Sequence, residues 1–146
     1  MKPLNIEVLR IRQGNAGLAE KAYDIRKKVF VGEMDIDPNV EYDKHDPTAH
    51  HYLVLLDDHP VGTARWRETE DGIKLERFAI LEEQRNRHIG KILLKEMLHD
   101  VVPLGKKIYL HAQLKAVPFY ERSGFKKIGE IFFEARLGHY YMEYKG

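Results

Sequence analysis

A short basic segment carries the residues best suited to bind an anion. It reads Arg85-Asn86-Arg87-His88-Ile89-Gly90-Lys91 and follows an apolar stretch that ends at Ile80. The first backbone N–H groups of a helix have no partner inside the helix, and the helix dipole adds to their attraction for phosphate oxygens. Glycine lets the backbone approach a ligand closely, and arginine matches phosphate geometry. The segment therefore predicts a diphosphate site, with a solvated helix start as the alternative. Its spacing fits neither a P-loop nor the dinucleotide fingerprint.

The pattern of apolar residues predicts the elements that hold this segment in place. Alternation predicts a strand at 4–12, and apolar spacings of three and four predict a helix over 16–31. Residues 32–48 contain Gly32 and two Asp-Pro steps, so a long irregular loop is expected there. The order is β-α-β-β-β-α-β-α-β-β, a mixed α/β pattern. Its further strands are expected at 52–56, 61–66, 73–80, 107–111, 126–133 and 139–144, and its further helices at 87–100 and 115–122.

Length and composition limit the class of protein. The 146 residues suit one domain spanning 1–146, and 24 basic against 23 acidic residues give a formal net charge of +1. This balance does not favour a nucleic-acid partner, and no apolar run reaches the roughly 18 residues that would span a bilayer. The absence of cysteine excludes a thiolate nucleophile and cysteine-based metal sites. Because the N-terminal residues also lack the layout of a signal peptide, a cytoplasmic protein is expected.

The eight histidines raise the question of a metal site. His45, His50 and His51 cluster with Asp43 and Asp46. Adjacent residues of a strand point to opposite faces, so His50 and His51 are not expected to bind one ion. No two histidines have the spacing of a zinc motif on one face. We therefore expect no metal.

Two motifs resemble the GNAT superfamily of N-acetyltransferases. Arg85, Ile89 and Gly90 fall where that family binds the pyrophosphate of coenzyme A. The chain departs from the motif at His88, where the family usually has glycine. The segment from His111 to Phe125 is similar to the family's fifth strand and the helix after it, with a polar amide, an alanine, a tyrosine and a final Gly-Phe at matching positions. The similarity covers essentially the whole chain.

The resemblance extends to a branch of the family and implies a fold. The stretch 29–33 and the late Phe-Phe-Glu-Ala are most similar to the small bacterial ElaA/YjcF-like branch. The implied GNAT (acyl-CoA N-acyltransferase) fold has a mixed, mostly antiparallel sheet, helices on both faces, and a V-shaped opening between the fourth and fifth strands. Acetyl-CoA (coenzyme A) is the implied co-substrate, with its carbonyl and pantetheine arm held by backbone groups of the fourth strand. The residues implied to contact it are Phe78, Ala79, Ile80, Arg85, Asn86, Arg87, His88, Ile89, Gly90, Lys91, Gln113 and Tyr120.

The implied activity is transfer of an acetyl group to a primary amine of a small molecule or peptide. The amine attacks the thioester directly, since no cysteine and no Ser-His-acid arrangement is present. The resemblance makes Tyr120 the acid that protonates the departing thiolate. A non-catalytic acyl-CoA-binding module is the alternative function. The resemblance is also compatible with a homodimer.

The general base and the charge of the acceptor stay open at this stage. An alkylamine is protonated at neutral pH, so a base is required. The period of a strand places Glu76 on the same face as Phe78 and Ile80, and Glu33 begins the acidic loop. These two carboxylates are preferred as the base over the histidines at 111 and 139. Two arginines on one strand face, Arg65 and Arg67, suit an anionic acceptor, whereas the acids at 33–46 suit a cationic one.

Overall fold

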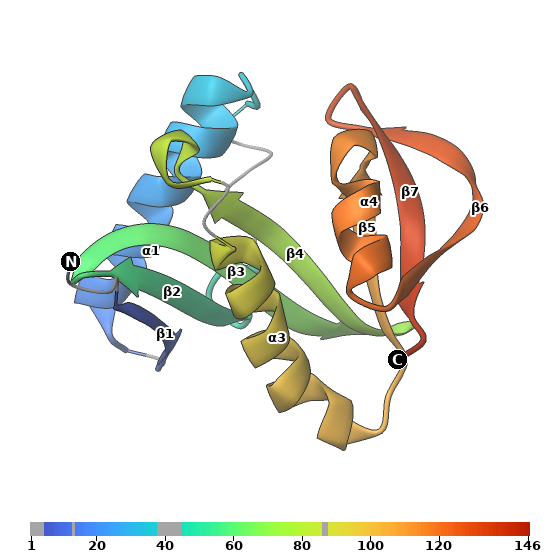
Figure 1. Ribbon diagram of the computed structural model, residues 1–146, viewed down its shortest axis with the longest axis horizontal. Helices are drawn as coiled ribbons and strands as arrows, with labels where there is room; N and C mark the ends of the chain where they lie inside the picture. Colours follow the sequence, from blue (N-terminus) through green and yellow to red (C-terminus); the bar gives the residue numbers. More distant parts are fainter. Residues whose placement is uncertain (1–4, 13, 38–44, 86–87) are drawn as a thin grey trace.

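The computed structural model describes residues 5–12, 14–37, 45–85 and 88–146 (Figure 1). Its centre is a seven-stranded sheet with the strand order β1-β2-β3-β4-β5-β7-β6. Neighbouring strands run antiparallel except β4 and β5, which are parallel. The predicted order of strands and helices is confirmed. The strands are β1 (Ile6–Ile11), β2 (His50–Leu56), β3 (His59–Thr69), β4 (Gly72–Ile80), β5 (Ile108–Gln113), β6 (Phe125–Glu134) and β7 (Leu137–Tyr144).

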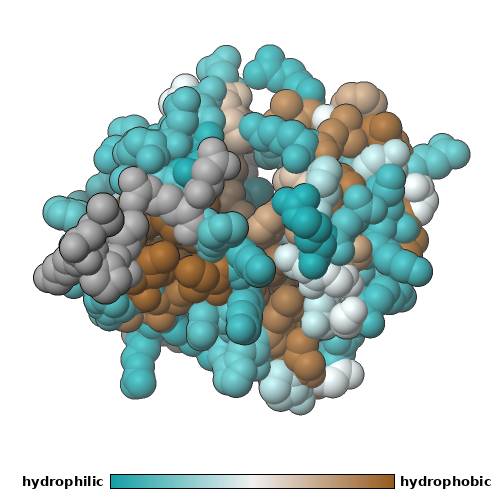
Figure 2. Space-filling model, viewed as in Figure 1, coloured by the Kyte–Doolittle hydropathy of each residue, from teal (hydrophilic) through white to brown (hydrophobic). Residues whose placement is uncertain are grey.

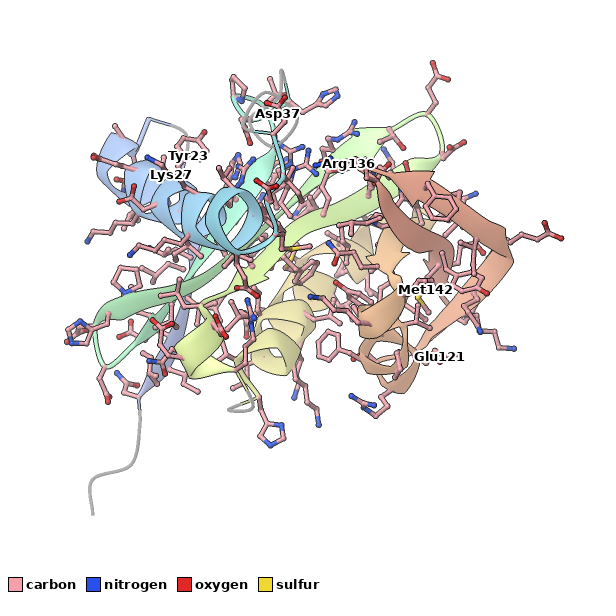
Figure 3. All side chains as sticks on the ribbon, turned by 90° about the horizontal axis from the view of Figure 1, so that it is seen from above. Tyr23, Lys27, Asp37, Glu121, Arg136 and Met142 are labelled. Carbon is pink, nitrogen blue, oxygen red and sulfur yellow. The ribbon has the colours of Figure 1, made fainter. Side chains whose placement is uncertain are left out.

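Helices cover both faces of the sheet, as the resemblance implies. The helix that carries Tyr23 and Lys27 lies on one face, and the helix that carries Glu121 lies on the other (Figure 3). No helix within the described ranges is long and apolar enough to cross a membrane. The helices are α1 (Ala16–Arg26), the π-helix η1 (Lys27–Glu33), α3 (Ile89–Val101) and α4 (Val117–Arg122), with 3₁₀ turns η2 (Glu82–Gln84), η3 (Val102–Leu104) and η4 (Leu114–Ala116).

Each face of the sheet has its own apolar core. On the α3 and α4 side, Leu93 and Met97 of α3 belong to one buried cluster with Leu75 and Leu110 of the central strands. On the α1 side, residues of α1 and η1 form a second cluster with Leu53 of β2 and Ala79 of β4. The predicted spacing in 16–31 is thus the spacing of residues that bury against the sheet. The two cores hold the helices against the sheet, so that helix ends lie near the opening between β4 and β5.

The helix predicted at 16–31 is confirmed but changes its geometry after Arg26. The Asn15 side chain accepts a hydrogen bond from the Leu18 N–H and so caps the start of α1. From Lys27 the chain continues as the π-helix η1, and the Met34 N–H bonds to the Val29 carbonyl five residues back. Single π turns occur often at functional sites. Residues 38–44 of the predicted acidic loop lie outside the described residues.

The two halves of the sheet are joined by a very short parallel pairing. β4 and β5 are in register only at Ile73–Ile108, Lys74–Tyr109 and Leu75–Leu110. Beyond Leu75 the strands diverge, as Figure 1 shows. At the closed end Gly72 has φ +139, and a Cβ there would lie 2.3 Å from the Lys107 carbonyl oxygen, so glycine is required. The predicted V-shaped opening between the fourth and fifth strands is therefore confirmed.

A β-bulge at Arg77 reverses the faces of the last part of β4. The pairing with β3 runs from Arg65–Glu76 to Thr63–Ala79, which leaves one extra residue on β4, and Arg77 has φ +59. The extra residue breaks the two-residue period of the strand. Phe78 and Ile80 pack in the core on the α3 side, whereas Glu76 faces the α1 side. The expectation that Glu76 shares a face with Phe78 and Ile80 is therefore wrong.

Candidate active site

A large cavity occupies the opening between β4 and β5. Its volume is about 1390 Å³, and Figure 2 shows the surface hollowed between the two halves of the molecule. The lining comes from η1, the outer part of β4, the start of α3, the end of β5, α4 and the β6–β7 hairpin. Most of the predicted site residues meet here. They are Glu33, Glu76, Phe78, Ala79, Ile80, Arg85, His88, Ile89, Gly90, Lys91, His111, Gln113, Tyr120 and His139. Asn86 and Arg87 lie outside the described residues.

The first turn of α3 points its free N–H groups toward one end of this cavity. Helix α3 begins at Ile89, two residues later than predicted, and Gly90 follows as its second residue. His88 precedes the helix with φ 60 and ψ 17, the left-handed conformation that glycine adopts without strain. A histidine thus adopts here the backbone conformation that glycine favours. A Cβ on Gly90 would lie 3.6 Å from the Phe119 ring, an ordinary contact.

Arg85 forms a two-pronged ion pair that sequence reasoning did not predict. Its Nη1 and Nη2 atoms donate to the two carboxylate oxygens of Glu33 at 2.7 and 2.8 Å, and its Nε donates to the Ile80 carbonyl at 3.1 Å. The pair ties the end of η1 to the loop before α3. The hydrogen bond from Arg85 lowers the pKa of Glu33, so this carboxylate holds a proton poorly.

The outer part of β4 borders the cavity along an edge with which β5 does not pair. Thr63 and Gly62 of β3 pair with Ala79 and Ile80 along one edge, while β5 no longer pairs with the other edge beyond Leu75. A buried backbone N–H or C=O without a partner is costly, so such an edge suits an extended polar ligand. The cavity is thus lined by main-chain donors and acceptors as well as by side chains.

Tyr120 lies in an apolar pocket at the wall of the same cavity. Its ring packs edge-on against Phe78 at 5.9 Å between centroids and also contacts Phe119 and Phe125. Burial raises the pKa of its hydroxyl, which therefore stays protonated near neutral pH. No described residue forms a hydrogen bond with that hydroxyl. Across the opening, the Gln113 amide approaches Met34 Sδ at 4.0 Å.

A buried charge network fills the α1 side of the β3–β4 pair. Asp46 accepts from Arg26 at 2.7 Å and from Arg65 at 2.6 Å, and Glu76 accepts from Arg65 at 2.9 Å and from Arg67 at 2.7 Å. Arg65 is fully buried and bound to two carboxylates, so the structure gives it a positioning role rather than contact with a ligand. Burial raises the pKa of Glu76, but the charges of Arg65 and Lys74 and the bond from Arg67 outweigh it and lower the pKa.

The two histidines predicted near the site have different surroundings. His111 Nδ1 lies 3.2 Å from Glu134 Oε2, and the bond from His111 lowers the pKa of Glu134 to about 2. With that carboxylate ionised, Nδ1 carries the proton and Nε2 is left as an acceptor. His139 is buried and bonds through Nδ1 to the Leu137 carbonyl at 2.8 Å.

The remaining histidine cluster behaves as the strand period predicts. His50 stacks on Trp66 with ring centroids 3.9 Å apart, on the face that carries α3. His51 lies on the other face, where its Nε2 bonds to the Asp46 carbonyl at 2.8 Å. Within the described part of the chain, no three His, Asp or Glu side chains are grouped to hold a metal.

Sequence reasoning missed Lys74 and Glu134 as residues of the cavity. The period of β4 already places Lys74 on the face of Glu76, so its position was open to prediction. Glu134 reaches the cavity only because β6 and β7 pair in one particular register, with Glu134 opposite Leu137. No local pattern gives that register.

Known proteins resemble this chain over most of its length. Residues 20–145 match the family model described as "Acetyltransferase (GNAT) domain". The "Uncharacterized N-acetyltransferase YjcF" of Bacillus subtilis is 32% identical over 123 residues, which are 83% of this chain and 88% of that protein. The crystal structure of Escherichia coli ElaA superposes with a TM-score of 0.84 at 24% identity, over 98% of this chain and 100% of that one. A GNAT family acetyltransferase from Elizabethkingia anophelis, solved with acetyl-CoA bound, gives a TM-score of 0.69 at 18% identity over 95% of each chain.

The left-handed conformation of His88 predicts an unusual effect of glycine. A His88→Gly variant should raise the free energy of unfolding by about 0.5–1 kcal/mol, because it removes the strain of a side chain at φ 60. The control is His99→Gly on the exposed side of α3, which should lower the free energy of unfolding by about 0.5 kcal/mol. Urea denaturation of both variants measures the two effects. Equal losses in the two would contradict strain at His88.

Proposed function

Since the chain belongs to the GNAT acetyltransferase family, we propose that it transfers the acetyl group of acetyl-CoA to a primary amine of a small molecule or peptide by direct attack. One observation carries the proposal. The free edge of β4, the N-terminus of α3 and the buried hydroxyl of Tyr120 all border a single cavity. These are the groups needed to hold a thioester with a diphosphate tail and to protonate its leaving thiolate. As in the wider family, the chain acts as an acyltransferase.

The residues around the proposed cofactor site have the donor chemistry that coenzyme A requires. The first turn of α3, from His88 to Lys91, supplies backbone N–H groups and one ammonium for the pyrophosphate. Gly90 adds no side chain to that turn, where a Cβ would make only an ordinary contact with the Phe119 ring. The outer edge of β4 at Phe78, Ala79 and Ile80 suits the pantetheine amides, and Gln113 borders the same opening. Asn86 and Arg87 remain proposed contacts.

Arg85 has a supporting role in this proposal. Its guanidinium is bound to Glu33 and to the Ile80 carbonyl, so it braces the loop that leads into α3. Its positive charge still lies beside the proposed diphosphate site, but Glu33 offsets it. We therefore assign recognition of the diphosphate mainly to the backbone of residues 88–91.

Tyr120 is proposed as the general acid. A phenol whose pKa is raised by burial keeps its proton in the resting site, where it can pass to the thiolate as the thiolate forms. As the amine nitrogen bonds to the acetyl carbon and the carbon–sulfur bond breaks, the hydroxyl donates its proton to the thiolate. The apolar rings around Tyr120 keep water away from that transfer.

The surroundings of the candidate bases favour His111 over both carboxylates. Arginine pairing lowers the pKa values of Glu33 and Glu76, so each is a weak base near neutral pH. His111 borders the cavity, and Glu134 orients its ring with Nε2 free to accept a proton. We assign proton removal from the acceptor amine to His111, with Glu134 stabilising the imidazolium that results.

A charge placed at Gly90 tests the cofactor site. Gly90→Asp should weaken acetyl-CoA binding by about 100-fold or more, because a carboxylate would stand beside the diphosphate. The helix dipole favours an acid in the first turn of a helix. Gly90→Ala is the control and should keep binding within about tenfold, since its methyl group only touches Phe119. Calorimetry with acetyl-CoA measures both. Tight binding by the aspartate variant would refute the site.

Loss of one hydroxyl tests the acid. Tyr120→Phe should lower kcat by about 100-fold while acetyl-CoA affinity stays unchanged, because only the proton donor is removed. Tyr144→Phe is the control, since Tyr144 contacts Phe125 in the same aromatic cluster. Thiol release from acetyl-CoA gives the rates. A Tyr120→Phe enzyme with full kcat would remove the acid role.

Loss of the imidazole tests the base. His111→Gln should lower kcat by about 100-fold, because an amide cannot accept a proton from the amine. His139→Gln is measured beside it and should keep the rate. A loss of rate in His139→Gln alone would transfer the role to His139.

A further inference from the structure

Two cations that line the cavity stand directly opposite each other. Arg67 of β3 pairs in register with Lys74 of β4, and both side chains lie on the α1 side of the sheet. Their side chains are only 22% and 13% exposed. Like charges opposite one another on neighbouring strands destabilise a sheet, and partial burial increases the repulsion. Such a pair requires negative charge nearby.

One carboxylate serves both cations and a third. Glu76 Oε1 lies 2.7 Å from Arg67 Nε, and Glu76 Oε2 lies 3.3 Å from Lys74 Nζ. The same Glu76 Oε1 also accepts from Arg65 at 2.7 Å. Among the described residues, no other carboxylate is within ion-pair distance of Arg67 or Lys74. The two Nη groups of Arg67 are therefore available to a ligand.

The carboxylates on this side of the cavity are already engaged. Glu33 pairs with Arg85, Asp46 pairs with Arg26 and Arg65, and Glu134 pairs with His111. The described acids that line the cavity, Glu33, Glu76 and Glu134, are thus all paired with basic side chains of the chain itself. The balance of charge that the sequence left open favours an anionic group.

We infer that the acceptor amine carries an anionic group, a carboxylate or a phosphate, which binds between Arg67 and Lys74. This inference rests on the proposed function. Lys74 pairs with Tyr109, and His111 follows on the same face of β5 two residues later, or about 7 Å along the strand. The anion and the amine can therefore belong to one small molecule or to one end of a peptide. The guanidinium fork suits either anion.

Matched acceptors test the inference. Each pair differs only in the anionic group: an amino acid and its carboxamide, a short peptide and its C-terminal amide, and phosphoethanolamine and ethanolamine. In either the carboxylate pairs or the phosphate pair, the anionic member should have a kcat/KM at least about tenfold higher than its neutral partner. The kind of pair that shows this advantage identifies the anion. The Arg67→Gln/Lys74→Gln variant should lose this advantage, so that its kcat/KM values with the two members of a pair become equal within about twofold. Lys95→Gln, on the exposed side of α3, should keep the advantage.

Two further measurements distinguish a failure of this inference from a failure of the proposed function. Calorimetry with acetyl-CoA shows whether each variant is folded and binds the cofactor. Arg67→Lys keeps the charge but loses the fork, so it should retain only part of the advantage if the double variant does not fold. Neutral members that react as well as anionic ones in every pair, or an advantage that survives in the double variant, would overturn the inference alone. Absence of both acetyl-CoA binding and thiol release in the unmodified protein would instead overturn the proposed function.

Discussion

The short pairing of β4 with β5 is the constraint on which the site depends. Three registered residue pairs hold the two halves of the sheet together, and past Leu75 the two strands no longer pair with each other. Polar backbone at the centre of a protein needs a partner, and the divergence leaves room for a ligand instead of another strand. The position of α3 follows from the same geometry, because α3 begins after the outer end of β4 and the turn η2, and its first turn borders the same opening.

The bulge at Arg77 allows one strand to serve both sides of that opening. Before the bulge, Lys74 and Glu76 face the charged network under α1. After it, Phe78 faces the α3 side and packs on Tyr120. A regular strand would place Glu76 on the side of Phe78, next to the apolar rings. The extra residue thus separates the charged network from the apolar surroundings of the proposed acid.

The sequence was sufficient for the order of elements, the opening between strands and most residues that border the cavity, because these depend on local periodicity and on motifs. It was insufficient where long-range contacts decide. Glu76 was assigned to the wrong face, since nothing local to β4 announces a bulge at a residue as ordinary as Arg77. The pairing of Glu33 with Arg85 joins residues 52 positions apart, and that of His111 with Glu134 depends on strand register. Charged residues of the same type in the sequence therefore differ in whether their side chains are already paired within the chain or can bind a ligand.

Burial of the charge network explains why its members differ in function. Removing a guanidinium from water is costly unless carboxylates compensate, and Arg65, the most buried of them, is bound by both Asp46 and Glu76. It is thereby fixed as a structural residue. Arg67 and Lys74, at the cavity wall, share what remains of Glu76 and keep donors facing the opening. Asp46 and Glu76 thus stabilise the β3–β4 pair. The positive charge of Arg67 and Lys74 stays at the cavity wall, where an acceptor would enter. Apolar side chains of equal volume on this face would stabilise the two strands but would not favour an anionic acceptor.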